Sequence, residues 1–305
     1  MSKILVTGSS GVIGRELLPL INQKGNMILA VDRVKPETKL PDVVYLQRNI
    51  GTDTTPEIEA FDPDTVFHLA ASFERTQETA DFFEPNFDDN IRCSHYIISH
   101  TKPKKFVFAS SYLVYERPLK YISGWGDLYA FSEIDPVNPR NLVAMSKLYT
   151  EKELEFKQHF NPSMKVINAR IFRSYGKGSR DIISRWIRAF LRNEKVNVWG
   201  QHNIFDYIYA GDVAFGLMML SELNTSVTVN LGSGEATAIS DVFSIVNNSA
   251  TPNKSILNIH PSGPIDEKSV SANYMLKELL NWKPPTTVFE GVQKIIKYER
   301  EKMGE

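Results

Sequence analysis

The sequence predicts an α/β protein built on a Rossmann-type, doubly wound parallel sheet. Short apolar runs typical of buried strands alternate with amphipathic helical patterns through the first half of the chain. A glycine-rich turn follows the first of these runs, and an acidic residue ends the second. These three observations together are the features of a dinucleotide-binding βαβ unit.

The composition is that of an ordinary globular protein. The chain has 305 residues, of which 42% are hydrophobic and 23% charged, so it suits one large domain or two small ones. A formal net charge of −1 creates no field that favours nucleic acid or an anionic membrane. The first strand begins at residue 3 and no apolar run is long enough to span a bilayer, so we expect a cytoplasmic protein.

Cysteine and histidine usage narrows the chemistry. The single cysteine, Cys93, excludes an internal disulfide and lies in a helical pattern, where we expect a small core residue. The six histidines are scattered without metal-ligand spacing, so the sequence predicts no metal site.

The first βαβ unit covers residues 3–32. An apolar strand over 3–7 enters a Gly-x-x-Gly-x-x-Gly turn, a helical stretch follows, and a second strand covers 27–31. Glycines allow a tight turn and close approach of a pyrophosphate, which the free N–H groups of the helix N-terminus can bind. The expected pyrophosphate contacts are Gly8, Gly11, Val12, Ile13 and Gly14. The alternative is a glycine-rich turn in a domain without cofactor.

Asp32, at the end of the second strand, indicates which dinucleotide binds. Its carboxylate can accept hydrogen bonds from the adenosine ribose hydroxyls, whereas it would repel the 2′-phosphate of NADP. The sequence therefore favours NAD. The neighbouring Arg33 is a second candidate contact and weakens that preference slightly.

With Thr7 before it, the glycine turn resembles the short-chain dehydrogenase/reductase superfamily, specifically its extended branch of nucleotide-sugar epimerases and dehydratases. The resemblance implies NAD as cofactor, a nucleotide-activated sugar as substrate, and transient hydride transfer. It also implies a cofactor domain over 1–170, to which 205–232 return, and a smaller substrate lobe mainly over 171–305. A homodimer through the helices near 84–101 and 141–159 is expected on the same ground.

Further cofactor contacts follow from the resemblance. Asn49-Ile50 takes the place of an Asp-Ile pair that reaches the adenine, and "His-Leu-Ala-Ala" matches the fourth strand, where Leu69, Ala70 and Ala71 approach the cofactor. We expect His68 to be a packed strand residue. Asn90 corresponds to an asparagine near the nicotinamide, and the alternative for it is a helix-surface amide.

The catalytic motif is incomplete. The strand over 105–109 runs into Ser-Ser-Tyr-Leu-Val-Tyr, which resembles the family's Ser-Ser-x-x-Val-Tyr motif and implies Ser111 as the catalytic hydroxyl, with Tyr112 beside the substrate. The family's Tyr-x-x-x-Lys motif ends here at Lys147, but Val143 stands in the tyrosine's place. Valine cannot transfer a proton, and losing a general acid or base typically lowers the rate by about 10²–10⁴.

Three interpretations of this replacement remain open. Another residue supplies the proton; or Lys147 and Ser111 act without a phenol; or the chain binds NAD and a sugar nucleotide with little turnover. Candidates for the first are Tyr112, Glu74 and the aromatic-rich segment with Tyr121, Trp125, Tyr129 and Phe131. Tyr112-Leu113 stands where the 4,6-dehydratases of the family carry Asp-Glu, which argues against a typical dehydratase.

The second half carries altered substrate motifs. Arg173 stands in the place of an asparagine that contacts the substrate diphosphate in the family, and Phe205 replaces an arginine with the same role. We expect Arg173 to compensate for that arginine, forming a basic cluster with Lys177 and Arg180; the alternative is a solvated, charged loop. Asp212 is expected to be the N-cap of a helix over 213–223.

Overall fold

The computed structural model describes residues 2–72, 78–117, 129–250, 257–260 and 267–304, and only the backbone of 257–260. The described chain forms two compact units. The first consists of Met1–Glu116, Ile134–Ile171 and Ala214–Val229, and the second of Arg117–Glu133, Phe172–Val213 and Asn230–Glu305.

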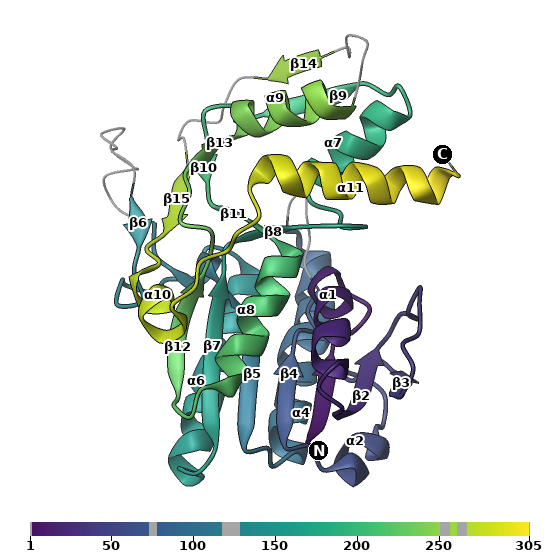
Figure 1. Cartoon of the computed structure of the whole chain (residues 1–305). Coiled ribbons are helices and arrows are strands. Elements are labelled where there is room, and N and C mark those ends of the chain that lie inside the picture. Colours follow the sequence, from purple (N-terminus) through teal and green to yellow (C-terminus); the bar gives the residue numbers. More distant parts are fainter. Residues whose placement is uncertain (1, 73–77, 118–128, 251–256, 261–266, 305) are drawn as a thin grey trace. The chain divides into compact units, whose positions relative to one another are not determined.

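The first unit is built on a seven-stranded sheet of order β12-β7-β5-β4-β1-β2-β3 (Figure 1). Its strands are β1 (Lys3–Thr7), β2 (Met27–Asp32), β3 (Val43–Gln47), β4 (Thr65–His68), β5 (Lys105–Ser111), β7 (Lys165–Ile171) and β12 (Val227–Leu231). The six strands from β7 to β3 pair in parallel. Their carboxyl ends therefore share one edge, where open α/β sheets bind ligands.

Helices cover both faces of this sheet. The chain first adds β2 and β3 on one side of β1 and then β4, β5 and β7 on the other, and right-handed crossovers in these two directions place their helices on opposite faces. One face carries α2 (Pro56–Phe61), α4 (Cys93–His100) and α6 (Leu142–Phe160), whose side chains Ile58, Ile97 and Leu154 share a buried core with the strands. Figure 1 shows α1 (Val12–Asn22) and α8 (Ala210–Glu222) in front of the sheet, on the other face, where Lys24 pairs with Glu222.

The expected helix over 84–101 is present but is not uniform. The chain passes from a 3₁₀ turn, η1 (Ala80–Phe82), into α3 (Phe83–Asn86), a π-helical segment, η2 (Phe87–Arg92), and then α4. A further 3₁₀ turn, η3 (Tyr112–Val114), follows β5. π-Helical segments are rare, and those that occur are often found at functional sites, so η2 is a candidate part of a functional site.

The second unit contains a small sheet and a helical layer. A four-stranded sheet has the order β13 (Thr237–Ala238), β10 (Ile204–Phe205), β15 (Lys268–Ser271) and β6 (Ala130–Phe131). Two parallel pairs join β8 (Arg173–Tyr175) to β11 (Tyr207–Tyr209) and β9 (Val196–Trp199) to β14 (Leu257–His260). The helices are α7 (Ile182–Leu191), α9 (Ile239–Ala250), α10 (Tyr274–Leu280) and α11 (Val288–Met303), and a buried core joins α7, α9 and α11.

Two aspartates stabilise the second unit, and one of them corrects a prediction. The buried Asp206 accepts hydrogen bonds from Ser233 N and Oγ at 2.7 Å, Gly234 N at 2.9 Å and Ser271. Asp212 is not an N-cap, because α8 already begins at Ala210 and Asp212 lies in its first turn. The Asp212 carboxylate instead accepts from the Thr286 N–H and hydroxyl, each at 2.9 Å.

Two further observations bear on the broad class of protein. In the part of the chain that the structure describes, no helix combines the length and apolar character needed to cross a membrane. Cys93 is buried as expected, and burial raises the pKa of its thiol to about 12.

Candidate functional site

The glycine turn after β1 fits closely against the neighbouring strand end. Gly8 has a φ of +71°, and a Cβ there would lie 2.6 Å from the Ala70 nitrogen. A Cβ on Gly14 would lie 2.4 Å from the Gly8 carbonyl oxygen. Gly11 is the N-cap of α1, and no described side chain caps this helix end. The turn therefore leaves the first N–H groups of α1 available to an anion.

Asp32 is fixed beside this turn. Its Oδ2 accepts the Ser10 N–H and its Oδ1 the Val34 N–H, both at 2.9 Å. These bonds hold the carboxylate at the carboxyl end of β2, while lone pairs remain for further donors. Arg33 forms an ion pair with Asp89 at 2.6 Å, so its guanidinium is engaged within the protein.

The carboxyl end of β4 is tied to β1 by a packed histidine. His68 Nδ1 lies 2.6 Å from the Thr7 hydroxyl, and its Nε2 lies 2.8 Å from the Ser94 hydroxyl. Its ring stacks on Phe108 at 5.7 Å, and burial lowers the pKa of His68 to about 3. The prediction of a packed strand residue is confirmed. The Ala70 N–H donates to Thr7 Oγ1 at 3.3 Å, which brings the Leu69–Ala71 segment against β1.

Asn90 lies in the π-helical segment and is buried, so the alternative of a surface amide is wrong. Its amide nitrogen donates to the Ser72 carbonyl at 2.9 Å, and its oxygen accepts the Ser72 N–H at 2.8 Å. Asn90 thus fixes the backbone that follows β4.

The predicted adenine contacts lie after β3. The Asn49 N–H donates to Asp53, and Ile50 is buried in the core.

Ser111 ends β5 and begins η3. Its Oγ accepts the Leu113 N–H at 3.2 Å, which leaves the hydroxyl hydrogen free to donate. Tyr112 is buried, and the Arg140 guanidinium lies 5.8 Å from its ring centre.

Lys147 is buried on α6 with its ammonium 4.7 Å over the Phe108 ring. Among the described residues it has no hydrogen-bonding partner, so its three donors are available to a ligand. Burial lowers the pKa of Lys147 to about 8. Val143, one turn earlier, is partly exposed, and Asn141 caps the helix by accepting the Ala144 N–H at 2.8 Å.

Several alternatives for the missing phenol cannot be placed beside Lys147. Glu74, Tyr121 and Trp125 lie outside the described residues. Tyr129 belongs to the second unit, where its ring meets Phe131 edge-on at 5.1 Å.

An ionic cluster near Lys147 was not predicted from the sequence. Glu151, one turn after Lys147, is buried and forms an ion pair with Arg170 on β7 at 2.8 Å. The Ser110 hydroxyl, on β5, donates to the same carboxylate. The available signal was the i,i+4 spacing of a lysine and a glutamate on one helix face.

In the second unit the two altered substrate positions meet. The Arg173 guanidinium lies 3.4 Å over the centre of the Phe205 ring. Lys177 is partly exposed and Arg180 exposed on the segment after β8. These two predicted positions therefore form one stacked pair.

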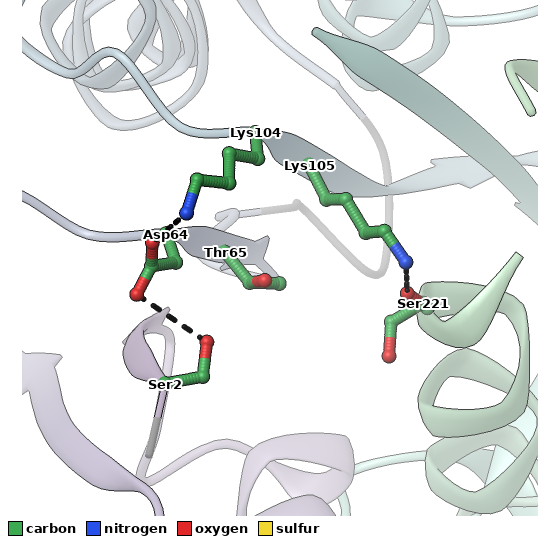
Figure 2. Close-up of a pocket in the computed structure, with 6 residues that line it drawn as sticks. All are labelled: Ser2, Asp64, Thr65, Lys104, Lys105 and Ser221. Carbon is green, nitrogen blue, oxygen red and sulfur yellow. Dashed lines mark hydrogen bonds and ion pairs between the residues drawn. The ribbon is translucent and has the colours of Figure 1, made fainter. Parts of the chain in front are cut away.

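The described residues contain no group of three His, Cys, Asp or Glu side chains that could hold a metal ion. They do contain a pocket of about 330 Å³ at the amino ends of β4 and β5. Figure 2 shows that its polar groups bind one another: Lys104 pairs with Asp64 at 2.9 Å, and Lys105 donates to the Ser221 carbonyl at 2.7 Å. This pocket lies at the opposite end of the strands from Asp32 and Ser111.

The residues present suit a dinucleotide with an unmodified adenosine ribose. The turn is sterically closed to side chains at Gly8 and Gly14, a carboxylate stands at Asp32, and Lys147 is a buried ammonium with unused donors. Asp32 ends β2 and the glycine turn follows β1, at the edge where open α/β sheets bind ligands, and Lys147 lies in the second turn of α6.

Comparison with known proteins agrees with this geometry. The model of the NAD dependent epimerase/dehydratase family matches residues 4–232. UDP-glucuronic acid decarboxylase 2 of Arabidopsis thaliana is 23% identical over 99% of this chain and 69% of its own. The crystal structure of UDP-glucose 4-epimerase of Thermotoga maritima with UDP-glucose has a TM-score of 0.85 at 23% identity, covering 99% of both chains. UDP-glucuronic acid 4-epimerase of Bacillus cereus, in complex with UDP-glucuronic acid and NAD, has a TM-score of 0.84 at 22% identity, covering 98% and 99%.

Proposed function

The chain belongs to the NAD dependent epimerase/dehydratase family, and from that premise we propose that it is an NAD-dependent enzyme acting on a UDP-linked sugar. The observation that carries the proposal is the group of three features suited to a dinucleotide: the glycine turn, Asp32, and Lys147, which has no hydrogen-bonding partner among the described residues. The base is proposed as uracil because the named relatives act on or bind UDP-sugars. The second unit is the proposed sugar-nucleotide lobe.

Each residue of the proposed cofactor site has one task. The N–H groups at the start of α1 bind the pyrophosphate, Asp32 accepts from the adenosine ribose, and the Lys147 ammonium donates to the nicotinamide ribose. Bound NAD supplies a hydride acceptor that can later return the hydride.

Ser111 is the proposed catalytic hydroxyl. With its oxygen accepting the Leu113 N–H, its hydrogen can be donated to the oxygen of the sugar carbon that changes oxidation state. Ser111 alone is too weak an acid and base to exchange that proton, and Val143 contributes nothing to it. Either proton exchange therefore limits the rate of the reaction at this site, or a residue outside the described part of the chain exchanges the proton.

Because Val143 cannot transfer a proton, a second function has to be tested against the first. The alternative is a protein that binds NAD and a sugar nucleotide but turns over little. Mixing the NAD-loaded protein with UDP-glucose, UDP-glucuronic acid or UDP-xylose separates the two by the absorbance of reduced nicotinamide and by product analysis. Restoring the motif with Val143→Tyr should raise hydride transfer in the weakly active protein, by up to about 10²–10⁴. Wild-type turnover that Val143→Tyr leaves unchanged would instead indicate a substitute base.

Arg173 is the proposed diphosphate ligand of the second unit. Its guanidinium is planar and always charged, the chemistry that binds phosphate oxygens, and it stacks on Phe205. Lys177 and Arg180 extend the basic segment on which the diphosphate would lie.

We propose a homodimer formed by α3, η2 and α6. Large apolar side chains are exposed on α6 at Met145, Tyr149, Phe156 and Phe160, a spacing that places all four on one stripe. Phe83 and Phe87 are exposed on the helical segment that packs beside α6. Monomers rarely expose contiguous apolar patches of this kind, and two copies related by a twofold axis would bury them.

A further inference from the structure

Three charged side chains are buried together beside β5. Lys147 and Glu151 lie on α6 and Arg170 lies on β7, and their exposed fractions are 7%, 4% and 7%. Burying an ion costs several kcal/mol unless its charge is compensated. The stability of these buried charges must therefore come from the way they are paired.

Glu151 is held rigidly from two sides. Arg170 donates to it through Nε at 3.1 Å and through Nη2 at 2.8 Å, so both carboxylate oxygens are engaged in a fork. The Ser110 hydroxyl donates to Oε1, and the Tyr115 ring lies 4.8 Å beneath the guanidinium. Burial alone would lower the pKa of Arg170, but the hydrogen bonds and charge of Glu151 raise it above its ordinary value.

Lys147, by contrast, has no carboxylate bonded to it among the described residues. Its ammonium lies over Phe108, and no described residue accepts a hydrogen bond from it. Glu151 follows it by four residues and so lies on the same helix face. Its charge therefore acts on Lys147 through space, and the donors of Lys147 stay unused.

The other titratable groups around Lys147 are neutral where Lys147 titrates. Burial lowers the pKa of His68, on β4, to about 3, and raises that of Cys93, on α4, to about 12. Near pH 8 an imidazole and a thiol of this kind carry no charge. On the helices packed against α6, the charged residues are Glu84 on α3 and three residues of η2, of which Asp88 pairs with Arg92 and Asp89 with Arg33. Glu78 accepts the Leu142 N–H at the start of α6, and Lys105 and Lys165 lie at the amino ends of β5 and β7. An anionic Cys93 would also raise the pKa of Lys147, but its thiol is neutral in this range. Among the described residues, Glu151 is therefore the buried anion whose charge offsets the burial of the ammonium, with Arg170 behind it.

We propose that Glu151 is a positioning residue for Lys147: held by Arg170 and Ser110, it keeps the ammonium protonated inside the core with its donors free for a cofactor ribose. The last clause rests on the proposed cofactor role of Lys147. The first does not, because it concerns the cofactor-free protein.

The test is the titration of Lys147 itself. Lysine labelled with ¹³C at Cε reports protonation by NMR in the cofactor-free protein, and the Lys147→Met variant assigns the signal. Glu151→Gln should lower the pKa of Lys147 by about 1 unit or more, because an attractive charge is lost. Glu155→Gln, the same change one turn later on the exposed side of α6, should leave that pKa unchanged.

Two further variants keep the test decisive if Glu151→Gln folds poorly. Arg170→Gln removes a repelling cation and should raise the pKa of Lys147, a change opposite in sign that a merely structural role would not produce. Glu151→Asp keeps the charge and should retain most of the wild-type pKa. An unchanged pKa of Lys147 in Glu151→Gln, or shifts of the same sign in Glu151→Gln and Arg170→Gln, would overturn the proposal.

The affinity for NAD as a function of pH then tests the cofactor clause. Calorimetric titration should show that NAD binding to the wild type weakens as the pH rises through about 8, and that Glu151→Gln moves this fall to lower pH by the shift seen in NMR. If the Lys147 titration shifts but the NAD affinity does not follow it, the cofactor role given to Lys147 is wrong while its coupling to Glu151 stands.

Discussion

A single carboxylate, Asp32, should decide both the strength and the selectivity of cofactor binding. The Ser10 and Val34 N–H groups hold it at the end of β2. Asp32→Ala should weaken NAD binding by about 1–3 kcal/mol, since charged hydrogen bonds to the ribose are lost. Calorimetric titration with NAD and NADP measures this change. Glu37→Gln, which removes an exposed carboxylate near the turn, serves as control. Equal affinity of the wild type for NAD and NADP would contradict this role of Asp32.

His68 should make the stability of the protein sensitive to acid. Burial lowers its pKa from 6.5 to about 3, so the unfolded chain takes up a proton more readily than the folded one. The stability that the neutral ring contributes is present above pH 6.5 and is lost as the pH falls towards 3. Within that range the loss is about 1.4 kcal/mol per pH unit.

Urea unfolding at about pH 7.5 and about pH 5 measures this effect. His68→Gln should remove that share of the pH dependence while keeping polar contact with Thr7 or Ser94. Equal slopes for the wild type and His68→Gln would show that His68 is not the acid-sensitive group.

At the scale of elements, the sequence predicted the positions of the strands whose residues are buried on both faces of the sheet. Strands in a parallel sheet covered on both faces are continuous apolar runs, so β1, β2, β4 and β5 begin where the pattern placed them. The π-helical character of η2 was not predictable, because a change from i→i−4 to i→i−5 backbone hydrogen bonds over a few residues is not marked by particular residue types. The pairing of Glu151 with Arg170 was not predictable either, since it arises only when β7 packs beside α6.

The contact between Arg173 after β7 and Phe205 on β10 permits an exchange experiment. Arg173→Asn should weaken binding of UDP by about tenfold or more, because a charged hydrogen bond to phosphate is lost. The double variant Arg173→Asn/Phe205→Arg installs the arrangement that the resemblance to the family implies, and it should recover much of that affinity. Calorimetric titration with UDP measures both.

Arg192→Gln, an exposed arginine just after α7, is the control for loss of a positive charge alone. If it weakens UDP binding as much as Arg173→Asn, the effect is one of overall charge. If the double variant binds no better than Arg173→Asn, the two positions do not share one role.

At the scale of the whole molecule, net charge and the exposed apolar side chains both bear on whether two copies of the chain associate. A formal charge of −1 leaves little overall repulsion between copies of the chain. The proposed homodimer would use the apolar stripe on α6, in which Phe156 and Phe160 are 69% and 82% exposed. Side chains of this size are enriched in interface centres and depleted from water-exposed helix faces.

The dimer can be tested by placing charge in that stripe. Tyr149→Glu together with Phe156→Glu should convert the protein to a monomer at tens of micromolar, because losing buried aromatic anchors costs about 2 kcal/mol or more each and the new carboxylates repel their symmetry mates. Sedimentation velocity measures the change, and Phe289→Glu on α11 makes a similar substitution at an exposed aromatic outside the stripe. We expect a dimer for the wild type and for Phe289→Glu. A wild-type monomer at the same concentration would contradict the proposal, and a double variant that remains dimeric would place the interface on another surface of the chain.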